Sequence, residues 1–158
     1  MPIDTAEVAQ RRLELAHFLP YRLSVLTNRV SNAIARTYAE RFDLTIPEWR
    51  VMAVLGGANQ LSARDVAERT AMDKVQVSRA IARLVARRRV QRLTDVADAR
   101  VMRLSLTARG RTIYDDIAPL ALSLEAILLD ALSPAERTML DRIMTKLGRQ
   151  VSLLGADI

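Results

Sequence analysis

The sequence predicts a mainly α-helical protein with one small β-hairpin. Apolar residues recur at helical spacing near both ends of the chain, helix-capping signals recur in its middle, and one short stretch alternates apolar and polar residues as strands do. The chain has 158 residues, of which 50% are hydrophobic. This length and composition favour one compact domain with an oligomerising extension.

The N-terminal region is expected to form a long helix from Pro20 to about Arg41. Apolar or small residues recur there in alternating steps of four and three, at Leu19, Leu23, Leu26, Val30, Ala33 and Thr37. This spacing aligns them in a heptad-like stripe on one face of the helix. Such a stripe favours association with another helix.

The same spacing predicts two more helices near the other end of the chain. Their stripes are Ile113, Ile117, Leu120, Leu124, Ile127 and Ala131, then Leu140, Ile143, Leu147, Val151 and Leu154. Between the two stripes, Ser133 can cap a helix, Pro134 fits its first turn, and Glu136 can bond back to the cap. A sharp junction between two apolar-faced helices is therefore expected.

Three shorter helices are expected in the middle of the chain. The first begins after the capping residue Thr45 and ends at the glycine pair 56–57. The second and third begin with residue pairs at capping-box spacing, which are Ser62 with Asp65 and Asp73 with Gln76. A tight turn separates them. Two short helices joined in this way are the pattern of a helix-turn-helix motif.

A two-stranded hairpin is expected directly after these helices. The segment "VQRLT" is followed by the small and acidic "DVADA" and then by "RVMRLSL", whose last residues alternate between apolar and polar. The two strands would be joined by a loop at about 95–100. The central region therefore combines a helix-turn-helix with a hairpin.

The helix that follows Asp73 carries charges of one sign. Every charged residue from 74 to 92 is positive, and the whole chain has a formal net charge of +6. Solvated helix faces normally mix both signs at i,i+4 spacing, because like charges repel. A membrane-surface helix would need a broader apolar face. The pattern favours a polyanion such as DNA as the partner, and a merely solvated face is the alternative.

Residue types on this helix suit the reading of DNA. An α-helix fits the major groove, where Arg pairs with guanine and Gln with adenine. Gln76, Arg79 and Arg83 are therefore candidate base-reading residues, with Lys74 and Ser78 near the phosphates. Gln76 has two interpretations, because its side chain can either read a base or complete the capping box with Asp73.

The hairpin loop offers a second candidate contact with DNA. An arginine inserted into the minor groove is favoured by the negative potential there. Arg100 is the candidate, and Asp98 could hold its guanidinium. The alternative is an exposed ion pair of little energetic consequence.

The order of these elements, together with one long motif, resembles the MarR family of bacterial transcriptional regulators. The motif is "VSRAIARLVARRRVQRLTDVADARVMRLSLTARG", in which Asp98, Arg100, Thr107 and Gly110 have the family's spacing. The resemblance extends from about "FLPYRLSVLTNRV" through the last helix. Two positions depart from the family pattern: Ala99 stands where a basic residue is usual, and Arg88 where a glycine usually ends the recognition helix.

The resemblance implies a homodimeric winged helix-turn-helix regulator, most often a repressor. It implies dimerisation helices in 1–44 and 107–158 around a DNA-binding lobe in 45–106. A two-fold dimer would place two recognition helices about 34 Å apart, which predicts a pseudo-palindromic site in double-stranded DNA. The residues expected to contact DNA are Ser62, Arg64, Lys74, Gln76, Ser78, Arg79, Arg83, Arg87, Asp98 and Arg100.

The resemblance also implies a small-molecule effector, because family members commonly respond to small aromatic acids. Such a site needs an aromatic wall and a cation for the carboxylate. The candidates are His17, Tyr21, Arg22, Tyr38, Trp49 and Arg50. Trp49 could equally be core, and either arginine could bridge subunits. A DNA-binding protein without an effector, architectural or controlled by a protein partner, is the alternative function.

Several other function classes are disfavoured by the sequence. The chain has no cysteine and one histidine, and it lacks a nucleophile motif or a glycine-rich phosphate loop, so we expect neither an enzyme nor a bound cofactor or metal. No apolar run approaches the roughly 20 residues of a membrane span, so we expect a cytoplasmic protein without membrane contact. A purely structural helical module is a third alternative, and it predicts no salt-dependent DNA binding.

Overall fold

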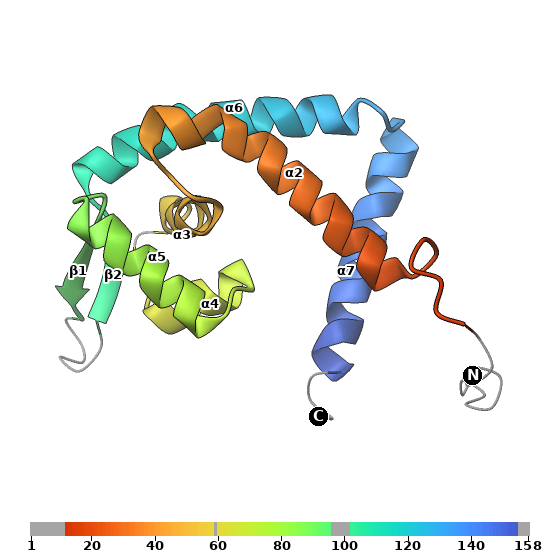
Figure 1. The fold of residues 1–158 in the computed structure, drawn as a ribbon, viewed down its shortest axis with the longest axis horizontal. Helices are drawn as coiled ribbons and strands as arrows, with labels where there is room; N and C mark the ends of the chain where they lie inside the picture. The colour runs from red at the N-terminus through yellow and green to blue at the C-terminus, as the bar shows by residue number, and fades with distance from the viewer. Residues whose placement is uncertain (1–11, 59, 96–101, 155–158) are drawn as a thin grey trace. The chain divides into compact units, whose positions relative to one another are not determined.

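The computed structural model describes residues 12–58, 60–95 and 102–154. Over these residues the chain forms six helices and one two-stranded antiparallel sheet (Figure 1). The elements are α2 (Leu19–Phe42), α3 (Ile46–Gly56), α4 (Ala63–Thr70), α5 (Lys74–Ala86), β1 (Val90–Thr94), β2 (Met102–Leu106), α6 (Ala108–Leu129) and α7 (Pro134–Leu154). The expected mainly α-helical fold with one hairpin is confirmed.

The chain divides into two compact units, Met1–Asp115 and Asp116–Ile158. Helix α6 runs through the boundary between them, and Pro119 lies inside this helix just beyond it. A proline has no N–H to donate to the carbonyl four residues earlier, which here belongs to Asp115. The regular helical hydrogen bonding is therefore interrupted at the unit boundary.

Helix α2 has the extent that its apolar stripe predicts. Its proline lies in the first turn, where the missing N–H costs nothing, and its C-cap Asp43 adopts a left-handed conformation with φ 48°. Most side chains in its first half are exposed, whereas Tyr38 near its end is fully buried. Only the last turns of α2 contribute to the core of the first unit.

The capping signals place the starts of the short helices correctly. Complete capping boxes form at Thr45 with Glu48 and at Ser62 with Asp65. At α5 the carboxylate of Asp73 accepts hydrogen bonds from the backbone N–H groups of residues 75 and 76, both at 2.9 Å. The side chain of Gln76 makes no hydrogen bond within the described residues, so the predicted capping box is only half formed.

The core of the first unit lies around α3, which Figure 1 shows end on beside α4 and α5. Helix α3 packs against α2, α4, α5 and β2. The helical spacing of apolar residues on α3, α4 and α5 directs one side of each helix inward. The fully or almost fully buried side chains are Val51, Met52, Leu55, Val66, Val77, Ile81, Leu84 and Leu104.

The hairpin pairs β1 with β2 in antiparallel register, from Val90 opposite Leu106 to Thr94 opposite Met102. Leu61, in the connection before α4, adds a two-way backbone bridge to Leu104, at 3.1 and 2.7 Å. This bridge ties the hairpin to the entry of α4. The position of the hairpin relative to the helix-turn-helix is therefore held by backbone hydrogen bonds as well as by packing.

Helix α5 ends in a Schellman motif, with Arg88 in the left-handed region at φ 54°. The N–H of Arg89 donates to Leu84 O and that of Arg88 to Val85 O, both at 2.9 Å. Arg88 is the residue that stands where the family usually has glycine. The backbone therefore keeps the glycine-type conformation, at a conformational cost of roughly 1–2 kcal/mol for a residue with a Cβ.

No single helix among the described residues is long and apolar enough to cross a membrane. Helices α6 and α7 are apolar and long enough for a membrane span only when they are taken together, and the pair is bent by 110° at its junction.

Gly110 is required by a close backbone approach at the start of α6. A Cβ at this position would collide with the backbone carbonyl of Arg89. We expect Gly110→Ala to lower the free energy of unfolding by about 1–3 kcal/mol, because backbone segments would have to separate. Urea denaturation at a fixed protein concentration measures this change.

Gly148 of α7 is the matched control, because a Cβ there would have nothing within 4 Å. We expect Gly148→Ala to leave stability unchanged or to raise it by up to about 1 kcal/mol, since alanine is the better helix former. Equal destabilisation by both substitutions would contradict the close approach at Gly110.

Candidate nucleic-acid interface

The outward face of α5 carries basic and polar side chains that have no partner in the described part of the chain. Lys74, Gln76, Ser78, Arg79 and Arg83 are all exposed, and none of their side chains forms an intramolecular hydrogen bond or ion pair there. Buried residues on the opposite side hold the helix on its lobe. The face is thus rigidly presented and its positive charges are uncompensated.

Helix α4 adds a charged residue that does have a partner. Arg64 is exposed and its Nε donates to the carboxylate of Glu68 at 2.9 Å. This hydrogen bond is the main reason that the pKa of Arg64 is raised. The Nη groups of Arg64 remain available to a phosphate while its Nε stays bonded to Glu68. Ser62, the N-cap of α4, has its hydroxyl bonded to Asp65 at 2.8 Å.

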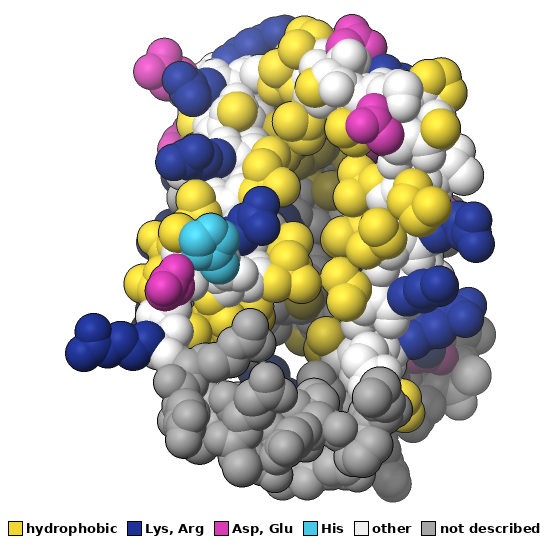
Figure 2. Space-filling view, turned by 90° about the vertical axis from the view of Figure 1, so that its right-hand side faces the viewer, with side chains coloured by type: hydrophobic (Ala, Val, Ile, Leu, Met, Phe, Trp, Pro, Cys, Tyr) yellow, Lys and Arg dark blue, Asp and Glu magenta, His cyan; other side chains and the backbone are white. Residues whose placement is uncertain are grey.

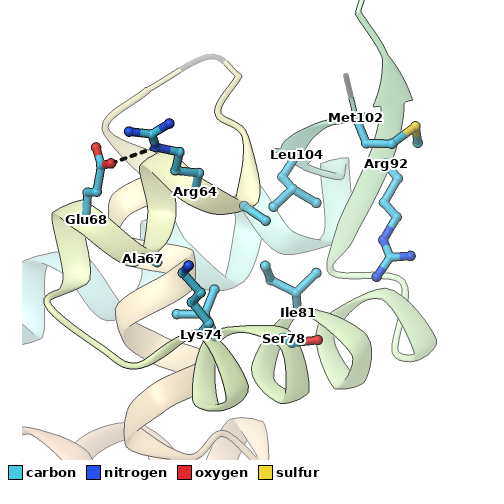
Figure 3. A pocket seen from close by; sticks show the side chains of 11 residues that line it. Arg64, Ala67, Glu68, Lys74, Ser78, Ile81, Arg92, Met102 and Leu104 are labelled. Carbon is cyan, nitrogen blue, oxygen red and sulfur yellow. Dashed lines mark hydrogen bonds and ion pairs between the residues drawn. The ribbon is translucent and has the colours of Figure 1, made fainter. Parts of the chain in front are cut away.

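A groove of about 660 Å³ lies between α4, α5 and the hairpin (Figure 3). Its floor is apolar, with Ile81 and Leu104 directed into it, and its edge carries Lys74 from α5 and Arg92 from β1. Arg92 is a basic residue that the sequence analysis did not select. The signal for it was a charge on the first strand of a hairpin beside the recognition helix.

The three consecutive arginines after α5 have different environments. Arg87 is the C-cap of α5 rather than part of its exposed face, and its Nη2 lies 2.7 Å from the carboxylate of Asp43. Arg88 is exposed. Arg89 is only 6% exposed and donates to the carbonyls of Phe42 and Asp43. Arg87, expected to contact DNA, therefore already has a partner in this chain.

Burial lowers the pKa of the Arg89 guanidinium. Desolvation is the largest cause of its lowered pKa, followed by the nearby positive charge of Arg87, while the buried carboxylate of Glu48 acts in the opposite direction. Glu48 is 1% exposed and accepts from Thr45 at 2.8 Å. Together, Phe42, Asp43, Arg87 and Arg89 join the end of α2 to the end of α5, and we call these four residues the clamp.

The hairpin contributes side chains near the end at which β1 connects to β2. Arg103 of β2 forms an ion pair with Asp95 and lies 3.6 Å from the carboxylate of Asp65. The hydrogen bond to Asp95 is the largest cause of the raised pKa of Arg103. Asp98 and Arg100, the predicted contacts at the loop, lie outside the described residues.

The candidate effector residues form two groups. Tyr38, Trp49 and Arg50 lie together in the first unit, where the ring centroids of Tyr38 and Trp49 are 5.5 Å apart and Arg50 donates to Ser31 at 3.1 Å. Burial raises the pKa of Tyr38 to about 12, and its hydroxyl has no hydrogen-bond partner in the described residues. An aromatic wall beside a cation is therefore present.

Tyr114 of α6 completes this aromatic row, and the sequence analysis did not select it. Its ring stacks on Trp49 with centroids 6.0 Å apart and covers Gly56, where a Cβ would collide with it. The guanidinium of Arg111 lies 5.3 Å from its ring centroid. The glycine at 56 was assigned only to ending α3, but it also makes room for this ring.

The remaining candidates, His17, Tyr21 and Arg22, lie at the other end of α2. They are exposed, and Nδ1 of His17 is 3.1 Å from the carboxylate of Glu14. With a rise of 1.5 Å per residue, the backbone at Tyr21 lies roughly 25 Å from that at Tyr38. One chain therefore does not bring all six candidates into a single pocket.

The comparisons with known proteins agree with this fold. Residues 42–101, from the end of α2 to the residue before β2, match the sequence profile of the MarR family. Over these residues the chain is that of a MarR-family DNA-binding lobe. It is therefore a transcriptional regulator rather than an enzyme, and its two-stranded sheet is the wing of a winged helix.

Similar proteins extend the match over most of the chain. An uncharacterised helix-turn-helix-type transcriptional regulator of Bacillus cereus is 28% identical over 126 residues, which are 79% of this chain and 83% of that protein. A MarR/EmrR family regulator from Acinetobacter sp. ADP1 has a TM-score of 0.82 at 23% identity, covering 89% of this chain and 99% of that one.

A second similar structure is that of BpsR of Bordetella bronchiseptica, whose DNA binding is regulated by 6-hydroxynicotinic acid. It has a TM-score of 0.75 at 25% identity and covers 87% of this chain and 98% of its own. The two solved structures show that the shared fold extends beyond the winged helix into the flanking helices.

The clamp makes a prediction about two adjacent arginines. We expect Arg89→Met to lower the free energy of unfolding by about 1–3 kcal/mol, because the carbonyls of Phe42 and Asp43 would lose a buried donor. Arg88→Met is the matched control, because Arg88 is exposed. Arginine and methionine both have a Cβ, so the cost of the left-handed backbone at position 88 does not change. Urea denaturation of both variants at one protein concentration makes the measurement, and similar losses would refute the clamp.

Proposed function

We propose that this MarR-family regulator binds a pseudo-palindromic DNA operator as a homodimer, with α5 in the major groove. The observation that carries the proposal is the exposed face of α5, where Lys74, Arg79 and Arg83 have no intramolecular partner among the described residues. Repulsion among these charges is relieved when phosphates replace solvent around them and counterions are released. The half-formed capping box leaves Gln76 available to a base.

The proposed DNA contacts divide by chemistry. Gln76, Arg79 and Arg83 reach base edges, because amide and guanidinium groups match adenine and guanine in the major groove. Lys74 and Ser78 meet the phosphates. The guanidinium of Arg64 at the start of α4 does the same, as does the hydroxyl of Ser62 if it exchanges its partner, and Arg92 joins them from the groove edge.

Two further DNA contacts are proposed, one from the end of α5 and one from the wing. Arg87 can approach a phosphate only by sharing its guanidinium with Asp43. Arg100, supported by Asp98, is proposed for the neighbouring minor groove, where an arginine is favoured by the local potential. We therefore assign the central specificity to α5 and a secondary role to the wing.

The proposed dimer uses the two ends of the chain, 1–44 and 107–158, around the lobe 45–106. Large apolar side chains are exposed on both ends in the single chain, and Figure 2 shows many such side chains at the surface. Ile127 and Val151, for example, are 67% and 64% exposed. Exposed apolar stripes on helices support association with a second copy, because their burial removes this surface from water.

We further propose that the protein is a repressor released by a small aromatic or phenolic acid. The regulation of BpsR by 6-hydroxynicotinic acid supports this class of effector. The group of Tyr38, Trp49 and Arg50 supplies the matching chemistry. In the present state Tyr38 is fully buried and Arg50 donates to Ser31. The acid would therefore displace Ser31 from Arg50 when it binds, and a regulator without an effector is the alternative.

The DNA-binding proposal is tested by selecting sites from a randomised duplex pool at two salt concentrations. We expect a pseudo-palindrome, and we expect Arg79→Met or Arg83→Met to cost about 1–3 kcal/mol on that site. The exposed Arg29 of α2 is the control, since Arg29→Met removes the same charge outside the proposed interface. Weak retention of all sequences would contradict a specific operator and indicate an architectural protein, and no salt-dependent binding would indicate a structural module.

The effector proposal is tested on the selected site with a panel of small aromatic acids that includes 6-hydroxynicotinic acid. We expect at least one acid to weaken DNA binding, and Arg50→Met to reduce that effect, because the carboxylate would lose its cation. The exposed Arg36 of α2 is the control, as Arg36→Met should leave the response intact. If no acid shifts DNA affinity, the effector-free regulator is the correct function.

A further inference from the structure

We propose that Val75 is a base-reading residue that recognises the 5-methyl group of a thymine in each half of the operator. This inference rests on the proposed function, since it requires α5 to lie in the major groove. It adds an apolar contact to a face that the sequence analysis had treated as basic and polar only.

Val75 lies opposite the buried side of the recognition helix. At 100° per residue, the four buried residues of α5 centre on one direction, and Val75, Arg79, Ala82 and Ala86 centre on the opposite one. Gln76 and Arg83 lie to one side of this row, and Lys74 and Ser78 to the other. The row is therefore the part of α5 that enters deepest into a groove.

The exposure of Val75 is unusual for its surroundings. Its side chain is 57% exposed, and within the described part of the lobe 45–106 only Met102 is another large hydrophobic residue with high exposure. Valine is also a poorer helix former than alanine or leucine. The Val75 side chain therefore contributes nothing to the core, and valine slightly disfavours the helix. A partner that contacts the side chain explains better why an apolar residue lies there.

The partner that fits is the thymine methyl group. It is the one apolar feature that the four base pairs present in the major groove, and small apolar side chains contact it. Val75 is in the first turn of α5, and the N-terminal residues of a recognition helix are those that reach base edges. Its χ1 angle has one strongly preferred rotamer in a helix, so little side-chain freedom is lost on contact.

The row also predicts the neighbouring bases. Arg79 lies one turn after Val75 on the same row, so the guanine that it would read lies close to the thymine. The alanines at 82 and 86 leave space beside the bases without adding polar groups. Each operator half-site is thus expected to place a thymine next to the base contacted by Arg79.

The test replaces thymines in the selected operator by deoxyuridine, which lacks only the methyl group. Substitutions are made one position at a time and symmetrically in both half-sites. We expect one position where the change weakens binding of the wild-type dimer by about fourfold per half-site, or about 15-fold for the pair. Val75→Ala should bind the thymine operator with a similar loss and should be insensitive to deoxyuridine at that position.

Val85→Ala is the matched control, because Val85 lies on the same helix, is only partly exposed and is outside the row. This variant should keep the wild-type sensitivity to deoxyuridine. Thermal unfolding of the three proteins checks that α5 is intact.

The outcomes distinguish a failure of the operator proposal from a failure of the role proposed for Val75. If wild-type protein selects no specific site, the operator proposal and the role of Val75 are both wrong. If it selects a site but every thymine tolerates deoxyuridine, or Val75→Ala keeps full sensitivity, only the role of Val75 is wrong.

Discussion

The structure depends on the clamp that joins the end of α2 to the end of α5. The guanidinium of Arg89, almost completely buried, donates to two carbonyls that end α2, and Arg87 pairs with the carboxylate beside them. Carbonyls in the last turn of a helix lack intrahelical partners, so buried donors there satisfy a requirement of the backbone. The clamp holds the end of α5 against the end of α2.

The same short segment organises the start of β1 and α6. The hydroxyl of Thr107 donates to Arg88 O at 2.7 Å, and the N–H of Thr107 donates to Arg89 O at 3.0 Å. Gly110 then allows α6 to pass directly against this backbone. One stretch of three arginines therefore fixes the end of a helix, the beginning of a strand and the entry of the helix that leads into the second unit.

The charge on α5 remains uncompensated because nearby acids are already used. Asp43 pairs with Arg87, Asp65 bonds Ser62 and lies near Arg103, Glu48 is buried, and Asp73 accepts from the backbone of α5. Each acid has a structural role that holds it away from the outward face. The excess of positive charge on that face is thus a product of the fold as much as of composition.

The sequence by itself determined the features that depend on residues close together in the chain. A single capping residue, Thr45, located the start of α3, and capping pairs at three-residue spacing located the starts of α4, α5 and α7. Alternation located the hairpin. All these interactions lie within one turn or one strand. The family resemblance followed from the same local motifs. The exposed residues of α5 were also predictable from helical periodicity.

Only the tertiary structure decided which arginines after α5 face solvent. The partners of Arg87 and Arg89 are 44 to 47 residues away in the chain, and no local pattern announces such contacts. For the same reason the sequence did not reveal Tyr114 beside Trp49. Residues of the same type, such as these arginines, are distinguished by how deeply they are buried and by which backbone carbonyls they hydrogen-bond. Both depend on contacts between distant parts of the chain, which local spacing does not encode.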